Sequence, residues 1–309
     1  MRNIFCIGAR GSRLALAQAK EIRDLLKAHD KRLRFRLVVV KTTGDKFRSA
    51  ALFKKNNIGV FTKALEAKLL KGEIDIAVHS LKDLPTKLPS GLTLAAVPKR
   101  LDPRDVLISR KRFTVSNLPK GASVGTGSPR RKRQLHFLRP DLALCDIRGN
   151  LDTRIRRVIQ ERKYDAVVVA RAGLLRLKKY LKFAQVIASD KLLPAVGQAA
   201  LGLETRTADK EAVGLVRKLN HRTTEQLVAM ERRFLDVLQG GCRVPVGVCS
   251  GTRNGNIYLK AAVFSTKTTA TIRGEILRPR DQYMEAGAVL ARRLLKKGAK
   301  KFLKEGRDV

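Results

Sequence analysis

A short apolar run in residues 74–85 stops at a group of titratable side chains just before a proline. Residues 74–78 alternate β-branched and other side chains, which predicts a strand, and Pro85 prevents its simple continuation. Four polar side chains follow the run, namely His79, Ser80, Lys82 and Asp83. Ligands of open α/β sheets bind beyond the carboxyl ends of strands, so these side chains are candidates for a site. Asp83 is the candidate for acid–base or electrostatic chemistry.

Arginines stand at the ends of several other predicted strands. The predicted strand over residues 4–8 leads to Arg10 and to a helix for which Ser12 is the expected N-cap. After a strand over residues 123–125, Ser128 fits the N-cap and Pro129 the first helical position. Arg130 and Arg131 then fall in the first turn, where cations oppose the helix dipole. This placement indicates that an anion binds there.

Two further strand-to-helix units, with strands predicted over residues 142–147 and 164–170, also carry arginines. They supply Arg148, Arg154 and Arg176. An arginine at one strand end means little, but the set favours a ligand with several carboxylates or phosphates.

Cys242 follows two glycines, so its sulfur can project from a loop. Spacing alone leaves open whether this cysteine is catalytic, covalently modified or incidental. His79 is the one base placed in the expected site, although it could simply end a strand. The sequence holds no Walker phosphate loop, dinucleotide glycine motif or metal-ligand cluster.

The composition is strongly basic. The 309 residues include 66 Lys plus Arg against 27 Asp plus Glu, a formal net charge of +39. The partner could be nucleic acid, an anionic membrane or a polycarboxylate, or the charge could reflect only a basic surface. An aromatic content of 5% without Trp argues against a base-stacking single-strand binder. Four scattered cysteines, no signal-peptide pattern and no apolar run of membrane-spanning length predict a cytoplasmic protein without membrane association.

The elements that must position these residues form two sets of strand-helix units. Residues 101–103 and 189–197 look like crossings between the sets, which predicts two lobes with a ligand in the cleft. Residues 42–59 show no periodicity and are expected to form a lid or binding segment. From residue 257, strands over 258–264 and 269–276 and a helix over 283–295 predict a small α+β domain.

Six motifs appear together in one order along nearly the whole chain. They are Ala9-Arg10-Gly11-Ser12-Arg13-Leu14-Ala15-Leu16, His79-Ser80-Leu81-Lys82-Asp83-Leu84-Pro85, Val124-Gly125-Thr126-Gly127-Ser128-Pro129-Arg130-Arg131, Arg148-Gly149-Asn150, Leu193-Pro194-Ala195-Val196-Gly197-Gln198 and Gly240-Gly241-Cys242-Arg243-Val244-Pro245. With these motifs the chain closely resembles the porphobilinogen deaminase (hydroxymethylbilane synthase) family of tetrapyrrole and haem biosynthesis.

The resemblance implies a fold and its domains. We expect an α/β protein with two periplasmic-binding-protein-like (type II) lobes joined by two hinge crossings, plus a small C-terminal α+β domain. Domain 1 would comprise residues 1–99 and 194–218, domain 2 residues 100–193, and domain 3 residues 219–309, which would carry the cofactor. The resemblance also implies a monomer.

The resemblance also implies the chemistry. Four porphobilinogen units would be joined, with loss of ammonia, to a dipyrromethane cofactor held by Cys242 through a thioether, and hydrolysis would release linear hydroxymethylbilane. Asp83 matches the catalytic acid. The implied cofactor contacts are Ser12, Lys82, Asp83, Ser128, Arg130 and Arg131, and the implied substrate contacts are Arg10, Arg148, Arg154, Arg176 and Gln198.

Asp45 falls in the implied mobile lid. Three residues depart from the family pattern, namely Arg13, Ile58 and Pro129, and Ile58 puts the lid chemistry in question. The alternative interpretation is a non-catalytic two-lobed anion-binding protein with a basic nucleic-acid-binding surface, motivated by the net charge.

Overall fold

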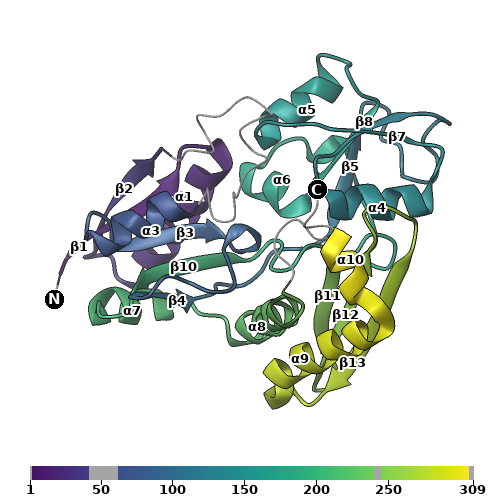
Figure 1. Ribbon diagram of the computed structural model, residues 1–309. Helices are drawn as coiled ribbons and strands as arrows, with labels where there is room; N and C mark the ends of the chain where they lie inside the picture. The colour runs from purple at the N-terminus through teal and green to yellow at the C-terminus, as the bar shows by residue number, and fades with distance from the viewer. Residues whose placement is uncertain (1, 42–61, 240–244, 306–309) are drawn as a thin grey trace. The chain divides into compact units, whose positions relative to one another are not determined.

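The computed structural model describes residues 2–41, 62–239 and 245–305, which form three sheets and their covering helices (Figure 1). The chain divides into two compact units. Unit 1 comprises Met1–Leu101 and Ala199–Glu225, and unit 2 comprises Asp102–Gln198 and Gln226–Val309. Within the described ranges, no helix combines the length and apolar character needed to cross a membrane.

Unit 1 contains a five-stranded mixed sheet in the order β2-β1-β3-β10-β4. Its strands are β2 (Arg34–Val40), β1 (Ile4–Arg10), β3 (Ile76–Ser80), β10 (Leu201–Arg206) and β4 (Leu92–Ala96). β1 is parallel to β2 and β3, whereas β10 is antiparallel to β3 and β4. The carboxyl ends of β1, β2 and β3 therefore share one edge.

Helices cover both faces of this sheet. On one face lie α1 (Arg13–His29) and α7 (Lys210–Arg217), and on the other lies α3 (Lys63–Leu70). Ala19, Ile22 and Leu26 recur at helical spacing in α1 and pack in one core with β1. On the α3 face, a Cβ added at Gly8 would lie 2.4 Å from the Ile74 Cδ1, so glycine permits the close packing there.

Unit 2 repeats this topology in a second sheet, with the order β7-β6-β8-β5-β9. The strands are β7 (Ala143–Cys145), β6 (Ser123–Gly125), β8 (Ala166–Ala170), β5 (Asp105–Ser109) and β9 (Ala184–Val186). β6 is parallel to β7 and β8, and β5 is antiparallel to β8 and β9. One face is covered by α4 (Pro129–Leu138), and the other by α5 (Leu151–Ile159) and α6 (Arg171–Leu177). In each sheet the antiparallel inner strand, β10 or β5, directly follows a connection from the other unit.

The third sheet, also in unit 2, is an antiparallel meander of β11 (Val246–Arg253), β12 (Asn256–Phe264) and β13 (Thr271–Arg278). It shares a core with α8 (Arg222–Val237), α9 (Tyr283–Leu294) and α10 (Lys300–Glu305). Gly287 of α9 faces α8, and a Cβ there would lie 2.4 Å from the Met230 carbonyl oxygen. Shorter helical turns span Leu181–Phe183, Arg280–Gln282 and Leu295–Ala299.

Two mixed sheets of the same strand order, followed by a small separate sheet, confirm the predicted fold class. The boundaries of the three expected domains stay a prediction. The sequence pattern did not predict β9, β10 or β11.

Candidate functional site

In unit 1, candidate residues gather where two neighbouring parallel strands end. β1 pairs with β3 through Ile7 with Ile76 and Gly8 with Ala77, so both strands point to the same edge. β1 ends in Arg10, which is half-buried. Ser12 caps α1 as predicted, because its Oγ accepts a hydrogen bond from the Ala15 amide at 3.2 Å.

The loop that carries Lys82 and Asp83 is a single 3₁₀ turn, η2 (Leu81–Asp83), directly after β3. Leu81 and Leu84 are buried on either side of Asp83, and the Leu81 amide donates to the Ala200 carbonyl at 3.0 Å. Lys82 is half-buried and Asp83 is exposed. Buried anchors thus hold an accessible carboxylate at the end of the strand.

A side-chain pair links α1 to the end of β3. The Gln18 Nε2 lies 2.9 Å from the Ser80 Oγ, and that hydroxyl lies 3.2 Å from the Gln18 Oε1. Gln18 is buried, so the contact fixes the helix that Ser12 begins against the strand that precedes Asp83. The structure therefore brings Arg10, Ser12, Lys82 and Asp83 to one edge of unit 1.

His79 is a residue of β3 rather than of the loop. Its Nε2 lies 2.9 Å from the Glu204 Oε2 on the neighbouring β10, and both side chains are buried. This contact holds the His79 side chain in the interior of unit 1. The imidazole is therefore not presented at the exposed edge beside Asp83.

In unit 2, the start of α4 follows the predicted pattern. Ser128 is the N-cap, with its Oγ 3.5 Å from the Arg131 amide, and Pro129 occupies the first helical turn. The helix begins after β6, whose carboxyl end shares an edge with those of β7 and β8. Arg130 and Arg131 consequently project from the first turn near that edge.

Both guanidinium groups at the start of α4 bind one buried carboxylate. Arg130 Nη2 lies 2.8 Å from Asp105 Oδ2, and Arg131 Nη2 lies 2.7 Å from Asp105 Oδ1. Asp105 is 0% exposed, Arg130 5% and Arg131 6%. Burial alone would raise the pKa of Asp105, but the two arginine charges outweigh it and hold that pKa well below its usual range. Burial, helped by the charge of Arg131, lowers the pKa of Arg130.

This cluster holds two cations and one anion, so it carries an excess positive charge in a buried place. Within the described residues, the Arg131 Nε is buried and has no hydrogen-bond acceptor. A buried charge without a counter-ion is costly. The donor set therefore suits an additional anion, and planar guanidinium groups match a carboxylate well.

The remaining arginines occupy different places in unit 2. Arg148 is exposed in the loop between β7 and α5, before Gly149 at φ +107°. Arg154, on α5, donates from Nε to the Gly149 carbonyl at 2.8 Å, so it braces the same loop. Arg176 lies in the last turn of α6, so the length of this short helix separates it from the end of β8.

Gln198, the last residue of unit 2 before the second connection, is buried against the same cluster. Its Nε2 donates to the Asp105 Oδ1 at 2.9 Å and to the Pro103 carbonyl at 2.6 Å. Asp105 is the functional residue that sequence reasoning missed. An acidic residue opening the apolar strand Asp105–Ser109 was the available signal, because a carboxylate there needs a buried partner.

Three further predictions fall outside the described residues. Cys242 lies in 240–244, and Asp45 and Ile58 lie in 42–61.

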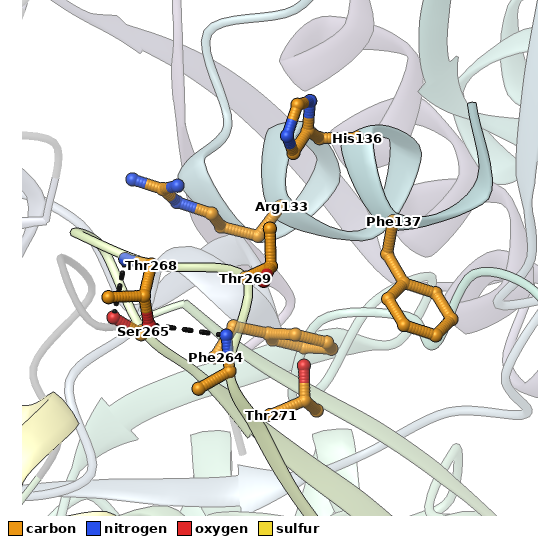
Figure 2. Close-up of a pocket in the computed structure, with 9 residues that line it drawn as sticks. Arg133, His136, Phe137, Phe264, Ser265, Thr268, Thr269 and Thr271 are labelled. Carbon is orange, nitrogen blue, oxygen red and sulfur yellow. Dashed lines mark hydrogen bonds between the residues drawn. The ribbon is translucent and has the colours of Figure 1, made fainter. Parts of the chain in front are cut away.

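The pocket drawn in Figure 2 lies in unit 2 between α4 and the β12–β13 turn, and its volume of about 220 Å³ includes space open to solvent. Arg133, His136 and Phe137 line it from the helix, and Ser265 and Thr268 line it from the turn. The Ser265 Oγ accepts from the Thr268 amide at 2.9 Å. Of the predicted site residues that the structure describes, none lines this pocket.

Comparisons with known proteins give a consistent result. Residues 5–214 match the family model described as porphobilinogen deaminase, dipyrromethane cofactor binding domain, and residues 226–296 match the C-terminal domain of porphobilinogen deaminase. The chain is 45% identical to the porphobilinogen deaminase of Chlorobium luteolum, covering 99% of this chain and 98% of the relative. It is 43% identical to that of Pelotomaculum thermopropionicum, covering 100% and 98%.

Among solved structures, a Bordetella pertussis BvgS VFT2 domain is similar at 16% identity and a TM-score of 0.42. The match covers 71% of this chain and 87% of that domain.

Proposed function

The chain belongs to the porphobilinogen deaminase family, and from this premise we propose which of its side chains carry the family's reaction. The enzyme is a transferase of tetrapyrrole biosynthesis. It joins four porphobilinogen units, with release of ammonia, to a dipyrromethane cofactor and releases hydroxymethylbilane. The alternative of a non-catalytic nucleic-acid-binding protein is not favoured, since relatives over the full length of the chain are porphobilinogen deaminases.

The buried cluster of unit 2 is the observation that carries the cofactor assignment. Two guanidinium groups share one carboxylate there, and the buried Arg131 Nε has no acceptor among the described residues. Dipyrromethane bears acetate and propionate groups, so its carboxylates would supply the missing negative charge. We assign Arg130, Arg131 and Ser128 in unit 2, and Ser12 and Lys82 in unit 1, to hold it.

Cys242 is the proposed attachment point, through a thioether. When bound, the cofactor supplies the primer to which substrate units are joined.

Asp83 is the proposed catalytic residue. Its carboxylate is exposed at the end of β3 and is held by the buried Leu81 and Leu84. It would accept a hydrogen bond from the pyrrole N–H of porphobilinogen and stabilise the positive charge that develops as ammonia leaves. With only 27 Asp plus Glu against 66 Lys plus Arg, the chain has few other carboxylates that could stabilise a cation.

The proposed substrate contacts are the cationic groups Arg10, Arg148, Arg154 and Arg176, whereas the Nε2 of the buried Gln198, also implied by the resemblance, binds Asp105 instead. Each porphobilinogen unit adds two carboxylates, and arginine pairs with these in a fixed planar geometry. We further propose a monomeric cytoplasmic enzyme for which nucleic acid is not a partner.

Intact-protein mass spectrometry tests the assignment. We expect protein from native expression to carry a two-pyrrole adduct, and Cys242→Ser protein to lack it. An unmodified protein that gains no adduct on incubation with porphobilinogen would contradict the proposal. An adduct that persists in Cys242→Ser protein would instead refute the attachment point alone.

A further inference from the structure

Within the described residues, Asp105 is the one carboxylate in the cluster at the start of α4, and its only mark in the sequence is its place at the start of an apolar strand. We propose that Asp105 is a positioning residue that holds Arg130 and Arg131 ready for ligand carboxylates and, through Gln198, fixes the unit 2 ends of both connections between the units. The inference rests on the proposed function of the two arginines.

Asp105 offsets part of the positive charge of the cluster. Without Asp105, two buried guanidinium groups would lie side by side with no anion between them, and like charges at short range repel strongly. Each Asp105 oxygen takes a separate arginine, at 2.8 and 2.7 Å, so the carboxylate sets the spacing of both groups. One anion cannot neutralise two cations, so the cluster is preorganised and still accepts a further carboxylate.

Main-chain carbonyls accept further hydrogen bonds from both arginines. Arg131 Nη1 donates to the Val168 carbonyl of β8 at 3.2 Å, and Arg130 Nη1 donates to the Leu193 carbonyl. Within the described residues, the hydrogen bonds of these two guanidinium groups thus go to Asp105 or to main-chain carbonyls. Such contacts fix orientation, while the Arg131 Nε remains buried and without an acceptor in the described part of the chain.

Gln198 links Asp105 to the unit 2 ends of both connections. Asp105 lies four residues after Leu101, the last residue of unit 1 before the first connection. Gln198 is the last residue before the second connection, and its Nε2 binds both Asp105 and the Pro103 carbonyl. One carboxylate therefore holds the segments through which the chain enters and leaves this part of unit 2. This geometry assigns Gln198 a positioning role, because its amide is committed to the cluster.

The test uses the full-length protein with Asp105→Asn, Gln198→Ala and the double variant Asp105→Asn/Gln198→Glu. The double variant exchanges the carboxylate and the amide between two side chains in contact, so the cluster keeps its composition. Readouts are the adduct fraction by intact mass and hydrogen exchange of the amides in residues 101–105 and 193–198.

Asp105→Asn leaves the buried arginines without a counter-ion, so we expect the adduct fraction to fall at least about tenfold, with faster exchange in both segments. The double variant is expected to recover part of both losses. Gln198→Ala keeps the charges, so the adduct should remain. Exchange in these segments should rise at least about fivefold, because the Nε2 hydrogen bonds to Asp105 and to the Pro103 carbonyl are both lost. If Asp105→Asn does not fold, the amide exchange rates of Gln198→Ala protein determine whether the inference holds.

The inference would be overturned if folded Asp105→Asn protein had the same adduct fraction and the same amide exchange rates as wild type. It would also be overturned if Gln198→Ala left the exchange rates unchanged. A double variant no better than Asp105→Asn would likewise refute a role for the carboxylate's charge. Failure of the proposed function is a separate outcome, because the wild-type protein itself would then carry no adduct.

Discussion

Replacing Asp83 by Asn removes the charge of the proposed catalytic group and keeps its shape. Asp83 is exposed, and the loop is held by the buried Leu81 and Leu84 rather than by this carboxylate. The substitution should therefore change the free energy of unfolding by less than about 0.5 kcal/mol. Its effect should be confined to the reaction.

The size of the catalytic effect follows from electrostatics. A carboxylate at about 4 Å from a full positive charge contributes about 4 kcal/mol at the effective dielectric constant of roughly 20 that suits a site near the surface. At about 1.4 kcal/mol per factor of ten, its loss corresponds to about a thousandfold in rate. We expect kcat to fall by about this factor, with a smaller change in KM.

The assay is single-turnover formation of hydroxymethylbilane, with adduct mass and thermal unfolding measured on the same samples. Asp24→Asn is the matched control, because it removes an exposed carboxylate of the same unit that pairs only with Arg23 among the described contacts. The control should keep its rate. A rate for Asp83→Asn within tenfold of wild type, with the adduct intact, would refute the electrostatic role.

Two further predictions concern stability. Gly287→Ala places a Cβ 2.4 Å from the Met230 carbonyl oxygen and should lower the free energy of unfolding by about 1–3 kcal/mol in urea titrations. Gly214→Ala in α7 meets no atom within 4 Å and should raise the free energy of unfolding by up to about 1 kcal/mol. Equal effects of the two substitutions would contradict the packing described for α8 and α9. Because Arg130 and Arg131 hold the pKa of Asp105 below its unfolded value, the carboxylate stabilises the fold fully above about pH 4 and loses that contribution as the pH falls toward its folded pKa. Wild-type protein should therefore lose stability more steeply between about pH 4 and pH 2 than Asp105→Asn protein, as measured by urea unfolding at each pH, and parallel curves would refute this.

Local sequence signals predicted many elements well. The strand expected over residues 123–125 is β6, and Ser128 and Pro129 occupy the predicted capping positions of α4. These features depend on neighbours a few residues apart, so the sequence displays them directly. β10 was missed because its buried Glu204 breaks the apolar pattern, and the partner that permits its burial, His79, is 125 residues away.

Contacts between residues far apart in the sequence also limited what could be predicted about the site. The first turn of α4 predicted that an anion binds near Arg130 and Arg131, which stays a prediction, and the structure shows that both arginines bind the protein's own Asp105. This partner was hidden because Asp105 lies about 25 residues earlier, at the start of another strand. His79 was expected to end a strand or act as a base, but its side chain turns inward to Glu204. Pairings between distant segments are set by the assembled sheets, not by spacing along the chain.

The position of β10 between β3 and β4 has a consequence for biosynthesis on the ribosome. The five strands of the unit 2 mixed sheet all fall within residues 105–186, so that sheet can assemble once this stretch has emerged. The unit 1 sheet lacks an inner strand until residues 201–206 are translated, which leaves β4 unpaired and an edge of β3 open through the whole synthesis of the other sheet. Until β10 is made, the open edge of β3 and the unpaired β4 are therefore available for pairing with other chains, so this stretch is exposed to aggregation during synthesis.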